Sequence, residues 1–78
     1  MTTRSLAQLN EGETGLIIKL LAGMTFKKRM TELGFTKNAD VKIIRKTIHG
    51  PMIIELKCCG RLAIGIGEAS KIIVKVGD

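Results

Sequence analysis

The clearest structural signal in the sequence is residues 41–59, which read VKIIRKTIHGPMIIELKCC. Two runs rich in β-branched residues predict strands, and His49-Gly50-Pro51 between them is typical of a turn. In the first run the apolar residues change parity, which predicts a bulge or bend midway. In the second run they alternate, so one face is expected to line the core with Met52, Ile54, Leu56 and Cys58.

The segments on either side of this hairpin predict further strands. Residues 15–20 are apolar and lie next to glycines, which favours a strand before the hairpin. Residues 62–66 and 72–76 alternate between apolar and other side chains, which predicts two strands after it. Ser5 precedes a short apolar segment and is expected to cap a single helical turn over residues 5–9.

One segment, residues 24–33, has the period of an amphipathic helix. Phe26, Met30 and Leu33 recur at helical spacing and share one face. Thr25 is the expected N-cap. After the helix, Gly34 supplies a left-handed residue, which would let Phe35 pack back on Met30.

About five short antiparallel strands, with one helix inserted after the first strand and short helical turns, indicate an all-β fold. A small SH3-like barrel fits this pattern, because barrel closure hides strand edges that would otherwise favour aggregation. A chain of 78 residues has no room for a second core, so residues 1–78 are expected to form one domain.

Composition narrows the function without selecting it. The net charge of +6 is compatible with nucleic acid, anionic lipid or an acidic protein as partner, or with solubility alone. The sequence has no Trp or Tyr and only two Phe. It therefore lacks the stacking platform of single-strand binders and the aromatic groove that grips proline-rich peptides, and no nucleic-acid partner is expected.

The sequence also indicates where the protein works. Its most apolar stretch, residues 15–24, contains Lys19 and is shorter than the roughly 20 apolar residues of a membrane-spanning helix. The N-terminus lacks the apolar region of a signal peptide. These features predict a cytosolic protein that does not insert into a membrane, in which Cys58 and Cys59 stay as thiols. A disulfide between adjacent residues would be strained, so the pair is not expected to staple the fold.

The chain carries no pattern typical of an enzyme or a metal site. It has no close pair of carboxylates, no phosphate-binding glycine loop and a single His49 distant in sequence from both cysteines. Two thiols and one imidazole fall short of the four ligands of a structural zinc site, and adjacent strand residues face opposite ways. No catalytic, cofactor-binding or metal-ligating residues are therefore predicted, and Cys58 is expected to act as a small core hydrophobe.

Elements along the whole chain resemble the FeoA family of small cytosolic partners of the bacterial ferrous iron transporter FeoB. The resemblance extends from about Ser5 to Val76. Its motifs are Leu6, Leu9, Gly12 and Gly15-Leu16-Ile17; Arg29-Met30-x-x-Leu33-Gly34-Phe35 and Val41; Gly50-Pro51-Met52; Arg61-Leu62-Ala63-Ile64, Glu68-Ala69, Ile72 and Val74. Where the family often has Pro-Gly after the helix, this chain has Lys37-Asn38, and Asn tolerates the left-handed conformation.

The resemblance implies a non-enzymatic accessory protein without a cofactor, which contacts the cytosolic GTP-binding region of a FeoB-type transporter. The helix and its exit loop, residues 36–40, are the expected contact region, with recruitment to the inner face of the cytoplasmic membrane. The candidate partner-binding residues are Met24, Lys27, Lys28, Arg29, Met30 and Lys37. Two alternatives remain open at this point, namely a small-barrel RNA- or ribosome-associated protein and a metal-binding protein that uses Cys58 and Cys59.

Overall fold

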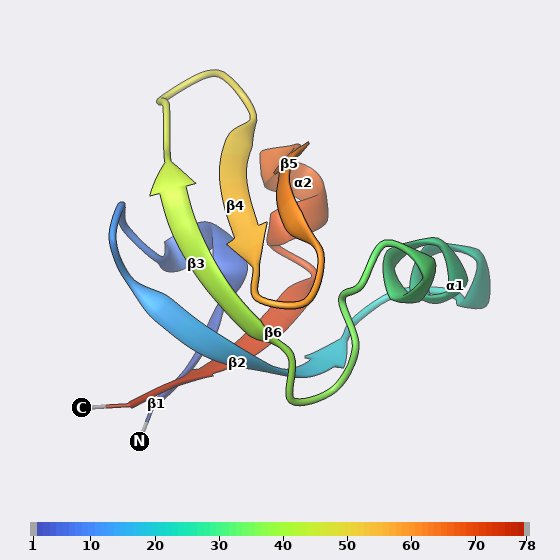
Figure 1. The fold of residues 1–78 in the computed structure, drawn as a ribbon. Helices are drawn as coiled ribbons and strands as arrows, with labels where there is room; N and C mark the ends of the chain where they lie inside the picture. Colours follow the sequence, from blue (N-terminus) through green and yellow to red (C-terminus); the bar gives the residue numbers. More distant parts are fainter. Residues whose placement is uncertain (1, 78) are drawn as a thin grey trace.

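A computed structural model of the chain describes residues 2–77. Its strands form a single antiparallel sheet in the order β1-β6-β2-β3-β4-β5. Figure 1 shows that this sheet curls strongly around η1 and α2, whereas α1 stands to one side of it. The elements are β1 Thr2–Ser5, η1 Leu6–Gln8, β2 Thr14–Leu20, α1 Met24–Glu32, β3 Asp40–Arg45, β4 Met52–Leu56, β5 Gly60–Ile64, α2 Ile66–Ala69 and β6 Ile72–Val76.

The all-β fold class is confirmed, and the strand count rises from about five to six. The additional strand, β1, pairs with β6 from Thr2↔Val76 to Ser5↔Ile73. It was missed because its polar sequence has no apolar alternation, and backbone pairing at the sheet edge holds it instead. The turn expected after Ser5 is present as η1, in which the Ser5 N–H donates to Gln8 Oε1 at 3.0 Å.

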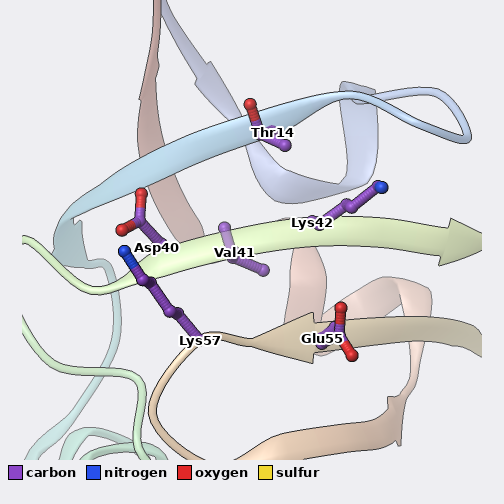
Figure 2. Close-up of a pocket in the computed structure, with 6 residues that line it drawn as sticks. All are labelled: Thr14, Asp40, Val41, Lys42, Glu55 and Lys57. Atoms are coloured by element: carbon purple, nitrogen blue, oxygen red, sulfur yellow. The ribbon is translucent and has the colours of Figure 1, made fainter.

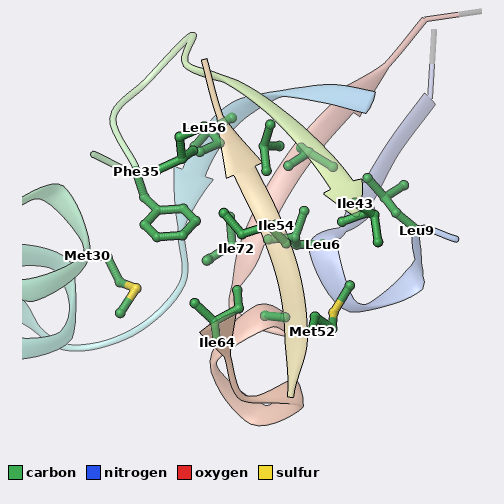
Figure 3. Packing of buried hydrophobic residues seen from close by; sticks show 14 residues of the cluster. Leu6, Leu9, Met30, Phe35, Ile43, Met52, Ile54, Leu56, Ile64 and Ile72 are labelled. Carbon is green, nitrogen blue, oxygen red and sulfur yellow. The ribbon is translucent and has the colours of Figure 1, made fainter. Parts of the chain in front are cut away.

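The inner face of the curled sheet forms the core. The expected apolar faces of β4 and β6 are both buried, at Met52, Ile54 and Leu56 and at Ile72 and Val74. Figure 3 shows these side chains converging with η1 and with two residues at the α1 end, Met30 and Phe35. The buried residues are Leu6, Leu9, Ile17, Met30, Phe35, Val41, Ile43, Met52, Ile54, Leu56, Ile64, Ala69, Ile72 and Val74.

The bulge expected in the first arm of the hairpin is present, but the strand is shorter than the apolar run. The register between β3 and β4 shifts between Ile43 and Arg45, where β3 ends. Beyond Arg45, backbone N–H groups bond to side chains instead of to a neighbouring strand. The Lys46 N–H donates to Glu11 Oε2 at 2.9 Å, and the Gly50 N–H donates to Thr47 Oγ1 at 2.9 Å. Ile48 is consequently 89% exposed at the tip of the loop.

The prediction for the cysteines is wrong on two counts. β4 ends at Leu56, so Cys58 lies in the exposed turn before β5 and contributes nothing to the core. The alternation of residues 52–58 continued into this turn only by coincidence, because Gly60, with φ of +88°, reverses the chain at once. The two cysteines also form a disulfide with each other instead of remaining thiols.

Candidate partner-binding surface

α1 begins and ends at glycines. The Gly23 carbonyl accepts the N–H of Lys27 at 3.1 Å, so Gly23 is the N-cap and the prediction of Thr25 is wrong. The predicted ending is confirmed. Gly34 has φ of +109°, the Gly34 N–H donates to the Thr31 carbonyl at 3.0 Å, and the Phe35 N–H donates to the Met30 carbonyl at 2.9 Å. This pair of bonds is a Schellman motif, which turns the chain from the helix back toward the sheet.

A few side chains hold α1 on the barrel. Met30 is 1% exposed, and the Phe35 ring just beyond the helix is equally buried. Phe26 is half-buried, with the Lys71 ammonium 5.4 Å from its ring centroid. The Arg29 guanidinium pairs with Glu68 Oε2, while Oε1 of the same carboxylate accepts the Gly65 N–H at 3.2 Å and so caps α2. Glu68 therefore joins the two helices.

The side of α1 that faces away from these contacts carries four of its residues around an open hollow of about 390 Å³: Met24, Lys27, Lys28 and Thr31. We call these four residues the α1 surface. Met24 is 86% exposed, although it is one of the larger apolar side chains. Three of the predicted residues, one apolar and two basic, thus line the same hollow.

A second hollow, of about 290 Å³, lies between α1 and β2 and continues this basic region. Lys19, Lys27 and Lys37 all line it. The exit loop is held against β2, because the Asn38 N–H donates to the Ile17 carbonyl at 2.7 Å and Asn38 takes a φ of +70° as expected. Lys19 was missed by the sequence analysis. Strict alternation would place Lys19 on the same face as the buried Ile17, and it is the register shift between these two residues that accompanies its exposure.

Two residues of the predicted contact set make contacts within the protein. Met30 is buried against the barrel, so no partner can reach its side chain. Arg29 is exposed, but its guanidinium is engaged by Glu68. Leu33, expected to share the buried face of the helix with Met30, is 45% exposed at the C-cap. In the exit loop, Thr36 and Lys37 border the α1–β2 hollow, whereas Asp40 begins β3.

A third hollow, of about 310 Å³, lies on the outer face of β2, β3 and β4 and has a different character (Figure 2). Asp40 and Glu55 line it together with Lys42 and Lys57, so its charges balance. Lys42 and Glu55 are direct cross-strand partners. On its other side, Glu55 pairs with Arg61 of β5 at 3.4 Å, so its carboxylate lies between basic residues of both neighbouring strands.

The described residues contain no grouping of three or more His, Cys, Asp or Glu side chains that could hold a metal ion. His49 lies exposed in the β3–β4 loop, and the cysteines lie in the β4–β5 turn. Across residues 2–77, no helix has the length and apolarity that crossing a membrane requires.

Comparison with solved structures places this architecture in the class of small SH3-like barrels. A crystal structure of an iron uptake regulatory protein, FeoA, superimposes with a TM-score of 0.88 at 26% identity, over 95% of this chain and 97% of that one. A zinc complex of Stenotrophomonas maltophilia FeoA, described as an SH3 domain protein, gives a TM-score of 0.78 at 24% identity, over 91% and 88% of the two chains.

The chain belongs to the FeoA domain family, whose sequence profile matches residues 4–76. A protein of Methanocaldococcus jannaschii described as Fe(2+) transport protein A is 37% identical to it over 70 residues. These residues span 90% of this chain and 83% of that relative. The resemblance on which the sequence analysis relied is therefore confirmed.

Proposed function

We propose that this protein is a non-enzymatic accessory of ferrous iron uptake, which binds the cytosolic GTP-binding region of a FeoB-type transporter through the α1 surface. Membership of the FeoA family and the name of the M. jannaschii relative support the link to ferrous iron transport. The observation that carries the proposed contact is the α1 surface itself, where a strongly exposed methionine lies among lysines.

Two physical arguments favour this surface over the rest of the molecule. Its lysines have no carboxylate lining either adjacent hollow among residues 2–77, so their field is available to an acidic partner. Met24 adds an apolar, flexible side chain of the kind that adapts to a partner pocket. Lys19 and Lys37 extend the positive region toward β2, and the same charge would attract the anionic inner leaflet beside the transporter.

In this arrangement the residues of α1 and its exit loop divide into two roles. Met24, Lys27, Lys28 and Lys37 contact the partner. Arg29 and Met30 keep the helix in place, through the ion pair with Glu68 and through burial against the barrel. Because the contact residues make no packing contribution to the core, their substitution should change binding without unfolding the protein.

Charge reversal tests the proposal. The double variant Lys27→Glu/Lys28→Glu should bind the purified cytosolic region of the transporter from the same organism about tenfold more weakly, which corresponds to about 1.4 kcal/mol. Calorimetric titration at low and at physiological salt measures this effect. The affinity of the native protein should fall as salt rises, because exposed charges are screened.

The matched control is Arg4→Glu/Arg45→Glu, which changes the net charge equally at two exposed positions on β1 and at the end of β3. Figure 1 shows that β1 and the end of β3 both lie far from α1. This control should retain most of the native affinity. Equal weakening by both double variants would mean that only the total charge matters, and unchanged affinity of the α1 variant would refute the proposed contact.

A further inference from the structure

The turn that contains the disulfide has backbone features that favour it independently of the bond. Leu56 of β4 pairs with Gly60 of β5, which leaves a three-residue connection. The Cys59 N–H donates to the Leu56 carbonyl at 3.1 Å, and Gly60 adopts φ of +88°. A tight turn followed by a left-handed glycine is a common three-residue hairpin loop. The backbone alone therefore specifies this turn.

The disulfide contributes little to folding stability by the usual route. A cross-link stabilises mainly by closing a loop in the unfolded chain, and the effect grows with loop length. Cys58 and Cys59 are adjacent, so the bond closes no such loop. Both residues lie exposed in the β4–β5 turn, so a small thiol in solution can approach the pair from the solvent side. The bond is therefore exposed like a reactive disulfide and closes no loop of the kind that a structural disulfide closes.

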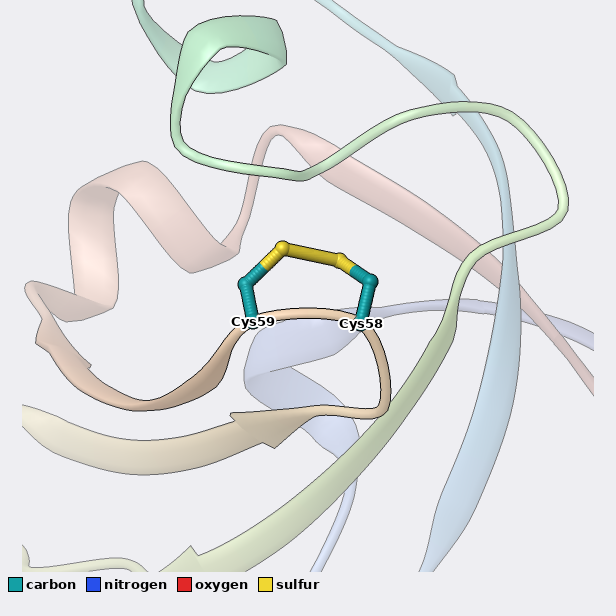
Figure 4. Close-up of a disulfide and its surroundings, with 2 residues drawn as sticks. All are labelled: Cys58 and Cys59. Carbon is teal, nitrogen blue, oxygen red and sulfur yellow. A yellow bond between two sulfur atoms is a disulfide. The ribbon is translucent and has the colours of Figure 1, made fainter.

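The two sulfurs lie against the end of α1. A Cβ atom added to Gly34 would lie 2.8 Å from Cys59 Sγ and 3.3 Å from Cys58 Sγ. Figure 4 shows the bridge directed from the β4–β5 turn toward the segment that leaves α1. Gly34 is the residue whose left-handed conformation ends the helix. The two sulfur atoms therefore lie beside Gly34, the residue that positions the end of α1. A change in the redox state of the cysteines changes what packs against it.

We propose that Cys58 and Cys59 form a reversible redox modification site for low-molecular-weight thiols of the glutathione class, and that its state is transmitted to the C-terminal end of α1. In the reducing direction, a thiolate attacks one sulfur, breaks the Cys58–Cys59 bond and forms a mixed disulfide. A second thiolate attacks that mixed disulfide and leaves as the small-molecule disulfide. Both cysteines end as protonated thiols, so two thiols are oxidised for each protein disulfide reduced.

Reduction must alter the contact with Gly34. Two thiols cannot stay at bonding separation, so at least one sulfur has to move. The space beside Gly34 is already occupied by both sulfurs and by Leu56 Cδ1, which lies 3.1 Å from the same added Cβ position. Movement of either sulfur therefore changes what packs against Gly34, and Phe35 follows Gly34 in the turn that ends α1. This inference does not depend on the proposed transporter contact and would hold for any role of α1.

The test uses the full chain equilibrated at a series of ratios of reduced to oxidised glutathione, then alkylated with iodoacetamide and weighed by mass spectrometry. The expected result is a reversible change between no alkylated cysteine and two, in the monomer and without a stable glutathione adduct. Two alkylated cysteines at every ratio, a stable adduct or a cross-linked dimer would each overturn the proposal.

Amide spectra of the same samples test the transmission. Reduction should shift the amide signals of Gly34 and Phe35 as well as those of residues 57–60. The amide signals of Thr47 and Gly50 in the β3–β4 loop should not change. Shifts confined to residues 57–60 would overturn the coupling to α1. The amide spectrum of the variant Cys58→Ser/Cys59→Ser should resemble that of the reduced chain and should not change with the glutathione ratio. If this variant folds poorly, the titration of the native chain still tests the proposal.

Discussion

The outer face of β2–β4 and the α1 surface are both hollowed, yet they carry charge in different ways. On the sheet, two carboxylates, Asp40 and Glu55, line the same hollow as Lys42 and Lys57, and the strand register places Lys42 opposite Glu55. At α1, lysines surround an exposed methionine without an acidic residue in either hollow of the described chain. The sheet places opposite charges beside one another, whereas the α1 surface exposes its lysines to solvent, where an acidic partner could reach them.

The two regions also differ in how they are held. Every long strand of the sheet buries residues in the core, whereas α1 buries Met30 alone. Its other attachments are the Arg29–Glu68 pair, the contact of Lys71 with Phe26 and the Schellman ending. Substitutions in the sheet should therefore change stability strongly, and substitutions in α1 should change it weakly.

The largest effect is expected from Ile54→Ala, at the centre of β4. Ile54 is fully buried, so removal of its side chain should lower the free energy of unfolding by about 2–5 kcal/mol. Ile48→Ala is the matched control, because Ile48 is the same residue type in an exposed loop and should cost no more than about 0.5 kcal/mol. Urea unfolding measures both, and equal losses would contradict the assignment of the core.

Gly34→Ala should come second and tests how tightly α1 is joined to the sheet. The left-handed backbone alone costs an alanine about 1–2 kcal/mol. The added Cβ would also press on the disulfide and on Leu56. Gly12→Ala provides the backbone cost by itself, because Gly12 has φ of +88° but open space around it. Equal destabilisation of the two variants in urea would show that the packing around Gly34 yields freely.

The Arg29–Glu68 pair should have the smallest effect. The two side chains are 58% and 36% exposed, and exposed pairs contribute about 0.2–1 kcal/mol. A double-mutant cycle of Arg29→Ala and Glu68→Ala isolates this coupling from the cap that Glu68 gives to α2. The coupling energy should shrink in 1 M salt. A coupling well above this range would mean that α1 is held as firmly as a strand.

Sequence patterns predicted the fold well where they reflected burial. Each of three patterns is compatible with only one local structure: the alternation in β4 and β6, the parity change in β3 and the glycine at the end of α1. The patterns failed where backbone hydrogen bonds determine the local structure, as in the polar edge strand β1 and in the turn at Cys58. For the site, spacing identified the basic helix, but it could not show that Glu68, 39 residues away, engages Arg29.

The most direct test of the account is an amide-shift titration of the native protein with the cytosolic region of the transporter. The account predicts shifts at residues 19–37, centred on Met24, Lys27 and Lys28, while amides of the outer sheet face at Thr14, Lys42 and Glu55 remain in place. Shifts on that sheet face with α1 unaffected would contradict it, because the balanced surface would then be the one that binds.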